Sequence, residues 1–110
     1  MDRFSEYRVM WILVLFDLPT ETTEDRRNYR KFRKCLIKCG FMMVQESVYA
    51  KLALNSTQVS QIVNEVRSKR PQKGIAQILT VTEKQFAKME FISGECNGNV
   101  IDSDERLLIL

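Results

Sequence analysis

An unbroken run of eight apolar residues near the start of the chain constrains the fold more than any other feature. Residues 9–16 read Val-Met-Trp-Ile-Leu-Val-Leu-Phe, and Asp17-Leu18-Pro19 ends the run. A helix that spans a membrane needs about 20 apolar residues, so this segment is far too short to be one. A continuous apolar run of this length is typical of a strand with both faces buried. We therefore expect a sheet built around residues 9–16 and no segment that enters a membrane.

Helical and strand patterns follow this run. Thr22 or Thr23 can cap a helix whose apolar residues recur at helical spacing and which Gly40 would close. Residues 45–47 join two short strand patterns, either as a tight hairpin or as a kink in one long strand. The expected elements are, in order, strand 9–16, helix 24–39, strands 41–44 and 48–54, a helix capped by Asn55 or Ser56 and ended by Pro71, strand 75–82, a helical turn at 83–88 and a short strand at 89–93.

This order of elements predicts an α+β, ferredoxin-like βαββαβ fold. Right-handed crossovers place both helices on one face of a four-stranded antiparallel sheet, and Trp11 and the Met42-Met43 pair are expected in the core. The length of 110 residues suits a single domain over the whole chain. Residues 1–8 precede it as an N-terminal extension, and residues 94–110 supply a polar loop and an extra C-terminal strand. The apolar end of that strand consists of Leu107, Leu108, Ile109 and Leu110.

The sequence contains no histidine and three cysteines. Without an imidazole, the chain cannot form a Ser–His or Cys–His catalytic pair or a Cys/His zinc site. Any chemistry must therefore use carboxylates, hydroxyls, thiols, lysines or bound metal ions. An odd number of cysteines without disulfide spacing indicates reduced thiols and a cytoplasmic location.

Positive charge is concentrated in the first predicted helix. The formal net charge is only +3, yet residues 26–38 hold seven bases and no acid. A solvated helix face is the usual explanation for a run of charge, but such faces normally intersperse glutamate with lysine, and the missing acids favour a surface for a polyanion. Without an aromatic platform, contact would be to backbone phosphate. The candidate residues are Arg26, Arg27, Arg30, Lys31, Arg33, Lys34 and Lys38, with a second group at Arg67, Lys69, Arg70 and Lys73.

Asp17 is the candidate catalytic and metal-binding residue. A lone carboxylate at the C-terminal end of a buried strand lies where open sheets place their ligands. The competing interpretation is a cap for the Asp-Leu-Pro turn, which the residues alone favour. One carboxylate is too few for Mg²⁺ unless a phosphate or a second chain contributes. A two-fold dimer that brings two copies of Asp17 together would supply the second carboxylate.

Several segments together resemble a known family. The strand end Leu15-Phe16-Asp17-Leu18-Pro19, the arginine-rich helix, Gly40-Phe41 and Gln45-Glu46-Ser47-Val48-Tyr49 closely resemble the second core Cas proteins, the small CRISPR-associated proteins of spacer acquisition. Residues 79–89 and 103–107 are similar to the branch that accompanies type II systems. The resemblance covers nearly the whole chain from residue 9 onward.

The resemblance implies a homodimer of ferredoxin-like subunits that bridges subunits of the CRISPR integrase and holds double-stranded spacer DNA on a basic surface. It also implies that the C-terminal strand of one subunit extends the sheet of its partner, which would place Leu107–Leu110 at the dimer interface. Members of the family are also known as magnesium-dependent endoribonucleases or DNases in which the strand-end aspartate binds the metal. Asp17 matches that position, so the resemblance implies Mg²⁺ at the dimer interface and RNA as a further ligand.

Two other functions stay open at this point. One is a stand-alone, toxin-like nuclease that depends on a metal held by Asp17. The other is a ferredoxin-like module that binds RNA, or a small-molecule regulatory domain of the same fold. Residues 73–78 lack the aromatic pattern of an RNA-recognition motif, and the chain has no glycine-rich phosphate loop. Both features weigh against the second alternative.

Overall fold

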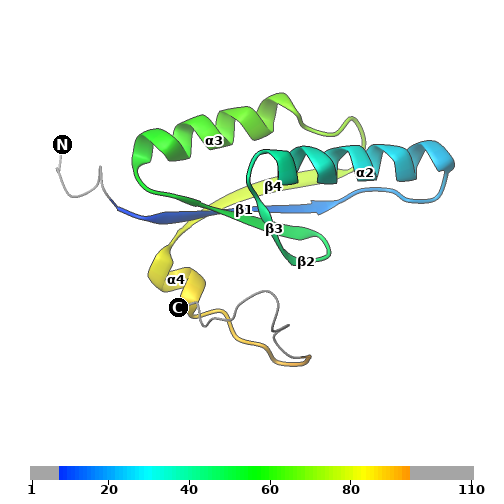
Figure 1. The fold of residues 1–110 in the computed structure, drawn as a ribbon. Helices are drawn as coiled ribbons and strands as arrows, with labels where there is room; N and C mark the ends of the chain where they lie inside the picture. The colour runs from blue at the N-terminus through cyan, green and yellow to red at the C-terminus, as the bar shows by residue number, and fades with distance from the viewer. Residues whose placement is uncertain (1–7, 95–110) are drawn as a thin grey trace.

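The computed structural model describes residues 8–94, which form a sheet with two helices on one face (Figure 1). The sheet has the order β2-β3-β1-β4, and all neighbouring strands are antiparallel. Helices α2 and α3 cover one face, and the short helix α4 lies on the other side (Figure 1). The elements are β1 (Met10–Asp17), α2 (Thr23–Lys38), β2 (Met42–Gln45), β3 (Val48–Ala53), α3 (Ser56–Ser68), β4 (Ile75–Thr82) and α4 (Glu83–Ala87). The predicted α+β class and βαββαβ order are confirmed.

Local hydrogen bonds fix the ends of α2 where the sequence predicted them. Thr22 Oγ1 accepts a hydrogen bond from Asp25 N at 3.0 Å, and Thr22 N donates to Asp25 Oδ2 at 3.3 Å, which completes a capping box. At the other end Gly40 has a φ of +94°, and Phe41 N donates to Leu36 O at 3.0 Å. This pattern is a Schellman motif, in which glycine adopts the left-handed conformation at low cost.

Residues Gln45 to Val48 form a tight hairpin rather than a kink. Gln45 pairs with Val48, so only Glu46 and Ser47 lie in the turn. The register of β2 shifts between Met43 and Gln45, which marks an irregularity just before the turn. Phe16 N donates to Ser47 O at 3.1 Å, and this bond ties the hairpin to the C-terminal end of β1.

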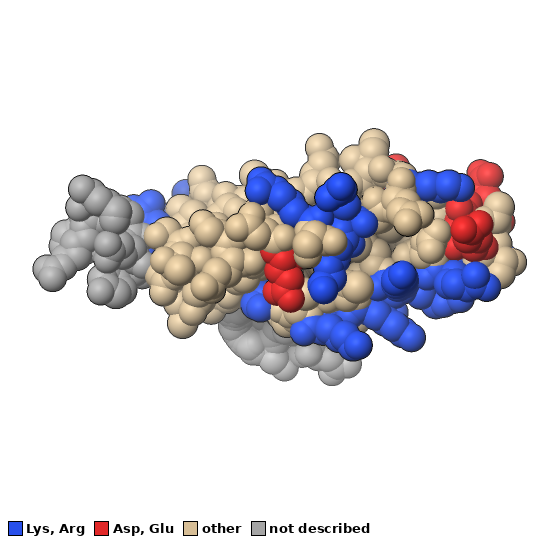
Figure 2. Space-filling model, turned by 90° about the horizontal axis from the view of Figure 1, so that it is seen from above, with Lys and Arg blue, Asp and Glu red and all other residues tan. Residues whose placement is uncertain are grey.

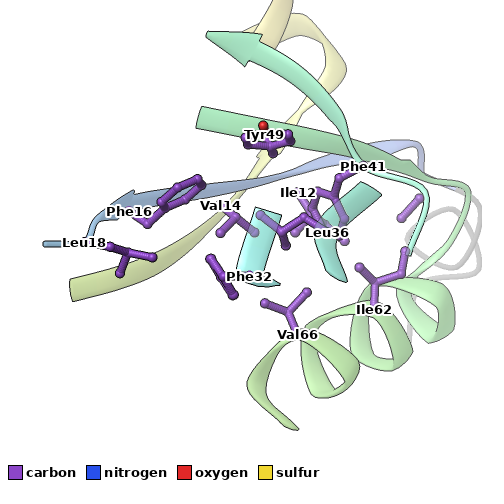
Figure 3. Close-up of a cluster of buried hydrophobic side chains, with 11 residues drawn as sticks. Ile12, Val14, Phe16, Leu18, Phe32, Leu36, Phe41, Tyr49, Ile62 and Val66 are labelled. Carbon is purple, nitrogen blue, oxygen red and sulfur yellow. The ribbon is translucent and has the colours of Figure 1, made fainter. Parts of the chain in front are cut away.

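The hydrophobic core lies between the sheet and the two covering helices (Figure 3). Strand β1 contributes alternate residues to it, and Tyr49 on β3 is completely buried. Phe16 contacts three aromatic rings, among them Phe32 edge-on at a centroid distance of 5.2 Å. The core consists of Ile12, Val14, Phe16, Leu18, Phe32, Leu36, Phe41, Tyr49, Ala53, Ile62 and Val66.

The second face of the sheet carries apolar side chains that the two long helices do not cover. Strand alternation and register place Leu13, Leu52 and Leu79 on this open face. Leu52 is 38% exposed and Leu79 is 53% exposed. Trp11 is half-buried there because it stacks on Phe86 of α4 at 4.4 Å. The open face is defined here as the side of the sheet opposite α2 and α3.

Three sequence expectations are wrong. Trp11 lies half-buried on the open face, against Phe86, and is not part of the core. Residues 89–93 form no strand: their exposed apolar side chains mimic a strand pattern, but the chain turns away from the sheet after α4 and, within residues 8–94, finds no strand to pair with (Figure 1). Met42 and Met43 are 41% and 43% exposed because β2 is an edge strand, so they are not core residues. Nearly all of the predicted N-terminal extension and C-terminal strand, including Leu107, Leu108, Ile109 and Leu110, lies outside the described residues. No helix within residues 8–94 is both long and apolar enough to cross a bilayer.

Candidate functional site

Asp17 is the last residue of β1 and is exposed to solvent. It pairs with Ile75, the first residue of β4, so the ends of two strands meet at this point. Among residues 8–94, none donates a hydrogen bond to its carboxylate or forms an ion pair with it. The carboxylate therefore does not cap the Asp-Leu-Pro turn within the described chain, and it remains available to a ligand.

A cavity of about 470 Å³ opens beside Asp17. Its walls are formed by the β1–α2 connection, by the first half of α2, which follows it, and by the β2–β3 turn, which is distant in the sequence. The Tyr29 hydroxyl donates to Glu46 O at 3.4 Å and joins α2 to that turn. The polar side chains lining the cavity belong to Asp17, Thr20, Arg26, Tyr29, Arg30, Glu46 and Ser47.

The two arginines of the cavity differ in how they are bonded. Nη1 of Arg26 donates to the carbonyl oxygens of Thr20 at 3.1 Å and Glu21 at 3.0 Å, and Nη2 lies 3.4 Å from Thr23 Oγ1. These contacts commit Arg26 to the β1–α2 connection. The guanidinium of Arg30 has no hydrogen-bond or ion-pair partner among residues 8–94. Arg30 is therefore the cation of this cavity that can meet a phosphate without breaking existing bonds.

Arg33 is held by the core of the protein. Its Nε donates to the hydroxyl of Tyr49 at 2.8 Å. Tyr49 is fully buried, so its hydroxyl occupies a fixed position beneath the helix surface. This hydrogen bond, followed by the charge of the Tyr49 phenol, raises the pKa of Arg33, which keeps the guanidinium charged.

The remaining bases of α2 lie exposed on the outer surface of the helix layer, which is formed by α2 and α3. Figure 2, which looks onto this layer, shows Lys and Arg side chains over much of it and only a few acidic side chains. The second basic group is partly engaged, since Lys73 Nζ lies 3.8 Å from Asp25 Oδ1. That contact is the sole ion pair formed between residues of the described range 8–94. The bases that stay exposed are Arg27, Lys31, Lys34 and Lys38 on α2, with Arg67, Lys69 and Arg70 at and beyond the end of α3.

The residues around Asp17 fit one kind of metal site and not another. No cluster of three or more possible ligands exists within residues 8–94, so a closed, all-protein metal site is not formed by the described part of one copy. Mg²⁺, however, is often held by one or two carboxylates together with water and substrate phosphates. An exposed Asp17 beside a cavity that Arg30 also lines suits that arrangement.

Sequence reasoning missed the open face as a candidate interface. It placed the dimer contact at Leu107–Leu110, beyond the described residues. A signal was present, because Leu52 and Leu79 lie at alternate positions of strands whose opposite faces also carry apolar residues. Such two-sided strands predict that both faces of the sheet are covered.

The sequence of this chain matches one protein family and several named proteins. The model of the family described as CRISPR associated protein Cas2 matches residues 10–89. A protein of Treponema denticola named CRISPR-associated endoribonuclease Cas2 is 52% identical over 101 residues, which cover 92% of this chain and 100% of the relative. Proteins of the same name from Streptococcus mutans and Ligilactobacillus salivarius are 46% and 44% identical, each over 92% of this chain and over 93% and 100% of their own lengths.

Solved structures agree on the fold. The crystal structure of Streptococcus pyogenes Cas2 at pH 6.5 aligns with a TM-score of 0.53 and 21% identity over 76% of this chain and 99% of that one. Another crystal structure of a Cas2 protein aligns with a TM-score of 0.55 and 13% identity, over 84% of this chain and 94% of the other. The resemblance seen in the residues is confirmed: this chain belongs to the Cas2 family of CRISPR-associated proteins.

Proposed function

We propose that this protein acts in the cytoplasm in CRISPR spacer acquisition, as a homodimer that holds double-stranded spacer DNA and bridges subunits of the CRISPR integrase. The observation that carries the proposal is the basic surface of α2, where seven bases in residues 26–38 are all exposed and no acid is interspersed. Membership of the Cas2 family supports it.

The geometry of the helix layer suits binding to a phosphate backbone. The exposed lysines and arginines lie on the outside of a rigid helix, so their charges face solvent together (Figure 2). No exposed aromatic side chain lies among the basic residues of α2 to stack on unpaired bases, which favours a duplex over a single strand. Binding of this kind releases counterions and therefore weakens steeply as salt increases.

The open face supports the homodimer. Leu52 and Leu79 on this face are partly exposed, and Ile75, at the end of the face where β4 pairs with Asp17, is 61% exposed. Burial of apolar area contributes about 25 cal/mol per Å², so a second copy placed on this face would be stabilised by removing these side chains from water. Asp17 lies at the C-terminal end of β1, at the end of the sheet. A dimer whose two-fold axis passes near this end would bring the two copies of Asp17 together.

Matched charge removal on the two sides of the molecule tests the proposal. Lys31→Gln with Lys34→Gln removes two charges from the helix layer, and Lys84→Gln with Lys88→Gln removes two charges at α4 on the other side. We expect the first pair to weaken binding of a fluorescent DNA duplex and to lower the salt slope by about 2 for each subunit that contacts the duplex. The second pair should bind like the wild type. Equal losses in both pairs would contradict a binding surface on α2.

A second activity follows from the cavity beside Asp17. We propose that it is a magnesium-dependent endoribonuclease site, because Asp17 and Arg30, whose charged groups have no partner among residues 8–94, both line it. When bound, Mg²⁺ neutralises phosphate charge and lowers the pKa of its water. Asp17 would hold the cation, and Arg30 would bind a phosphate oxygen of the RNA. Arg26 fixes the conformation of the β1–α2 connection through its hydrogen bonds to Thr20 O and Glu21 O. The names of the relatives support this activity.

Variants of these three residues separate their roles. Asp17→Asn should abolish magnesium-dependent cleavage of a labelled RNA while duplex binding stays largely intact. Arg30→Gln should raise the KM for RNA without loss of thermal stability. Arg26→Gln removes the same charge from the same cavity but should chiefly lower the melting temperature. Cleavage that is unchanged in Asp17→Asn would exclude a nuclease centred on this carboxylate.

A further inference from the structure

We propose that Gly74 is a positioning residue for Asp17, because the absence of a side chain at Gly74 determines where the main chain of Asp17 lies. The inference rests on the proposed role of Asp17 in binding a divalent cation. Gly74 directly precedes β4 and lies beside the end of β1, where Ile75 pairs with Asp17.

The contact between the two residues is too close for any side chain. A Cβ atom at Gly74 would lie 2.6 Å from Asp17 O, 2.8 Å from Leu18 Cδ2 and 2.9 Å from Leu18 Cα. Real Cβ atoms essentially never approach other atoms within 3.0 Å, so the main chain of Asp17 and Leu18 would have to move. Leu18 cannot move freely, because it is buried in the core.

The opposite side of the contact is also fixed. Gly74 has a φ of +85°, a conformation that glycine adopts without strain. The preceding residue, Lys73, forms the ion pair with Asp25 at the start of α2. That exposed ion pair is weak, but the next residue, Ile75, pairs with Asp17 in the sheet, so the loop that carries Gly74 is tied to the end of β1. A side chain at Gly74 would therefore strain this junction and shift Asp17 relative to Gly74.

A side chain at Gly74 would displace Asp17 by an amount comparable with the tolerance of a metal site. Raising the closest contact from 2.6 Å to 3.0 Å requires Gly74 and the Asp17 carbonyl to separate by at least 0.4 Å. Functional groups must be held to within about 0.5 Å of their working geometry, so a shift of this size is enough to weaken a ligand. The carboxylate is attached to the same residue, so the shift moves it relative to Arg30 across the cavity.

Gly40, another glycine with a positive φ, provides a matched control. Gly40 has a φ of +94°, but a Cβ atom there meets only the flexible end of Lys51, at 3.0 Å from Nζ. Asparagine tolerates positive φ better than other residues with a side chain. Gly74→Asn and Gly40→Asn therefore carry similar backbone strain, while only the first presses on Asp17. If Gly74→Asn does not fold, Gly74→Ala can replace it, because alanine places the same Cβ atom against Asp17 with a smaller side chain.

Paramagnetic broadening by Mn²⁺ in the isotope-labelled full chain reads the position of the cation site directly. In the wild type, Mn²⁺ should broaden the amide of Leu18, and Asp17→Asn should remove this effect. We expect Gly74→Asn to shift the Asp17 and Leu18 amide resonances before metal is added. We also expect it to raise the Mn²⁺ concentration at half-maximal broadening about tenfold or more, because loss of a residue that orients a metal ligand typically costs this much affinity. Gly40→Asn should lose thermal stability but keep the wild-type midpoint.

Two results would overturn the proposal in different ways. A wild-type Mn²⁺ midpoint in Gly74→Asn, with a melting temperature lowered as in Gly40→Asn, would reduce Gly74 to a structural glycine and leave the role of Asp17 intact. No broadening at Leu18 in the wild type would remove both the cation site at Asp17 and the positioning role that depends on it.

Discussion

The buried hydroxyl of Tyr49 accepts a hydrogen bond from Nε of Arg33 at 2.8 Å, so the most buried aromatic residue of the sheet orients a cation on the helix surface. The ring of Tyr49 stacks on Phe16 at 5.7 Å, which fixes the hydroxyl from below. Of the described bases on α2, Arg33 is the one tied to the core in this way. The basic surface is thus linked directly to the packing that defines the fold.

Tyr49→Phe tests this link. The substitution keeps the ring in the core but removes the hydroxyl, so Arg33 loses its orientation and keeps its charge. We expect duplex affinity to fall about two- to tenfold, the equivalent of one hydrogen bond, while the salt slope stays as in the wild type. Fluorescence anisotropy at several salt concentrations measures both quantities. Unchanged affinity would mean that the orientation of Arg33 does not matter for binding.

Lys51 stabilises the end of α2 from the neighbouring sheet. Its Nζ donates to the carbonyl oxygen of Cys39, the C-cap residue, and it is only half-exposed. A cation at a helix C-terminus also interacts favourably with the helix dipole. We expect Lys51→Met to lower the free energy of unfolding by about 1–2 kcal/mol. Urea denaturation measures this, and Lys31→Met on the exposed side of α2 should change stability little. Equal effects would contradict the capping role.

The proposed homodimer predicts the effect of a charge placed on the open face. Leu79→Glu places a charge on this face, and the fold should tolerate it because Leu79 is already 53% exposed. We expect a folded monomer in analytical ultracentrifugation. Ile37→Glu is the control, since Ile37 is 48% exposed but lies on α2 in the helix layer. A Leu79→Glu protein that remains dimeric would place the interface elsewhere.

The thiol of Cys39 provides a pH-dependent probe of the contact between α2 and α3. Burial, followed by a hydrogen bond with Glu65, raises the pKa of Cys39. Because a raised pKa delays formation of the thiolate, alkylation should reach its half-maximal rate at a higher pH than for the same thiol in the urea-unfolded protein. Mass spectrometry on a Cys35→Ser, Cys96→Ser protein isolates this thiol. A folded-state midpoint at or below that of the unfolded protein would contradict the burial of Cys39.

Local patterns predicted most of the fold. The helix expected at 24–39 is observed as α2, because the capping threonine and the closing glycine act through hydrogen bonds between residues close in sequence. Strand β4 is observed at the predicted bounds for a related reason, since turn residues flank it. The failed strand at 89–93 shows the limit of such patterns. A strand needs a partner, and the position of that partner depends on the whole fold.

The candidate site was only partly accessible to sequence reasoning. The position of Asp17 at a strand end followed from the apolar run before it. The different bonding of Arg26 and Arg30 could not be predicted from the sequence. Both belong to one run of basic residues, and they differ only in that loop carbonyl oxygens accept hydrogen bonds from Arg26. The contact between Gly74 and Asp17 could not be predicted either, because it joins residues far apart in the sequence and depends on the register between β1 and β4.

The dependence of duplex binding on salt tests the central claim most directly. If the basic surface of α2 holds a DNA backbone, the logarithm of the association constant falls linearly with the logarithm of salt concentration. For six or more phosphate contacts in the dimer, affinity should drop about a thousandfold between 50 and 200 mM salt. An affinity that stays flat over this range would contradict a DNA-binding role for this protein.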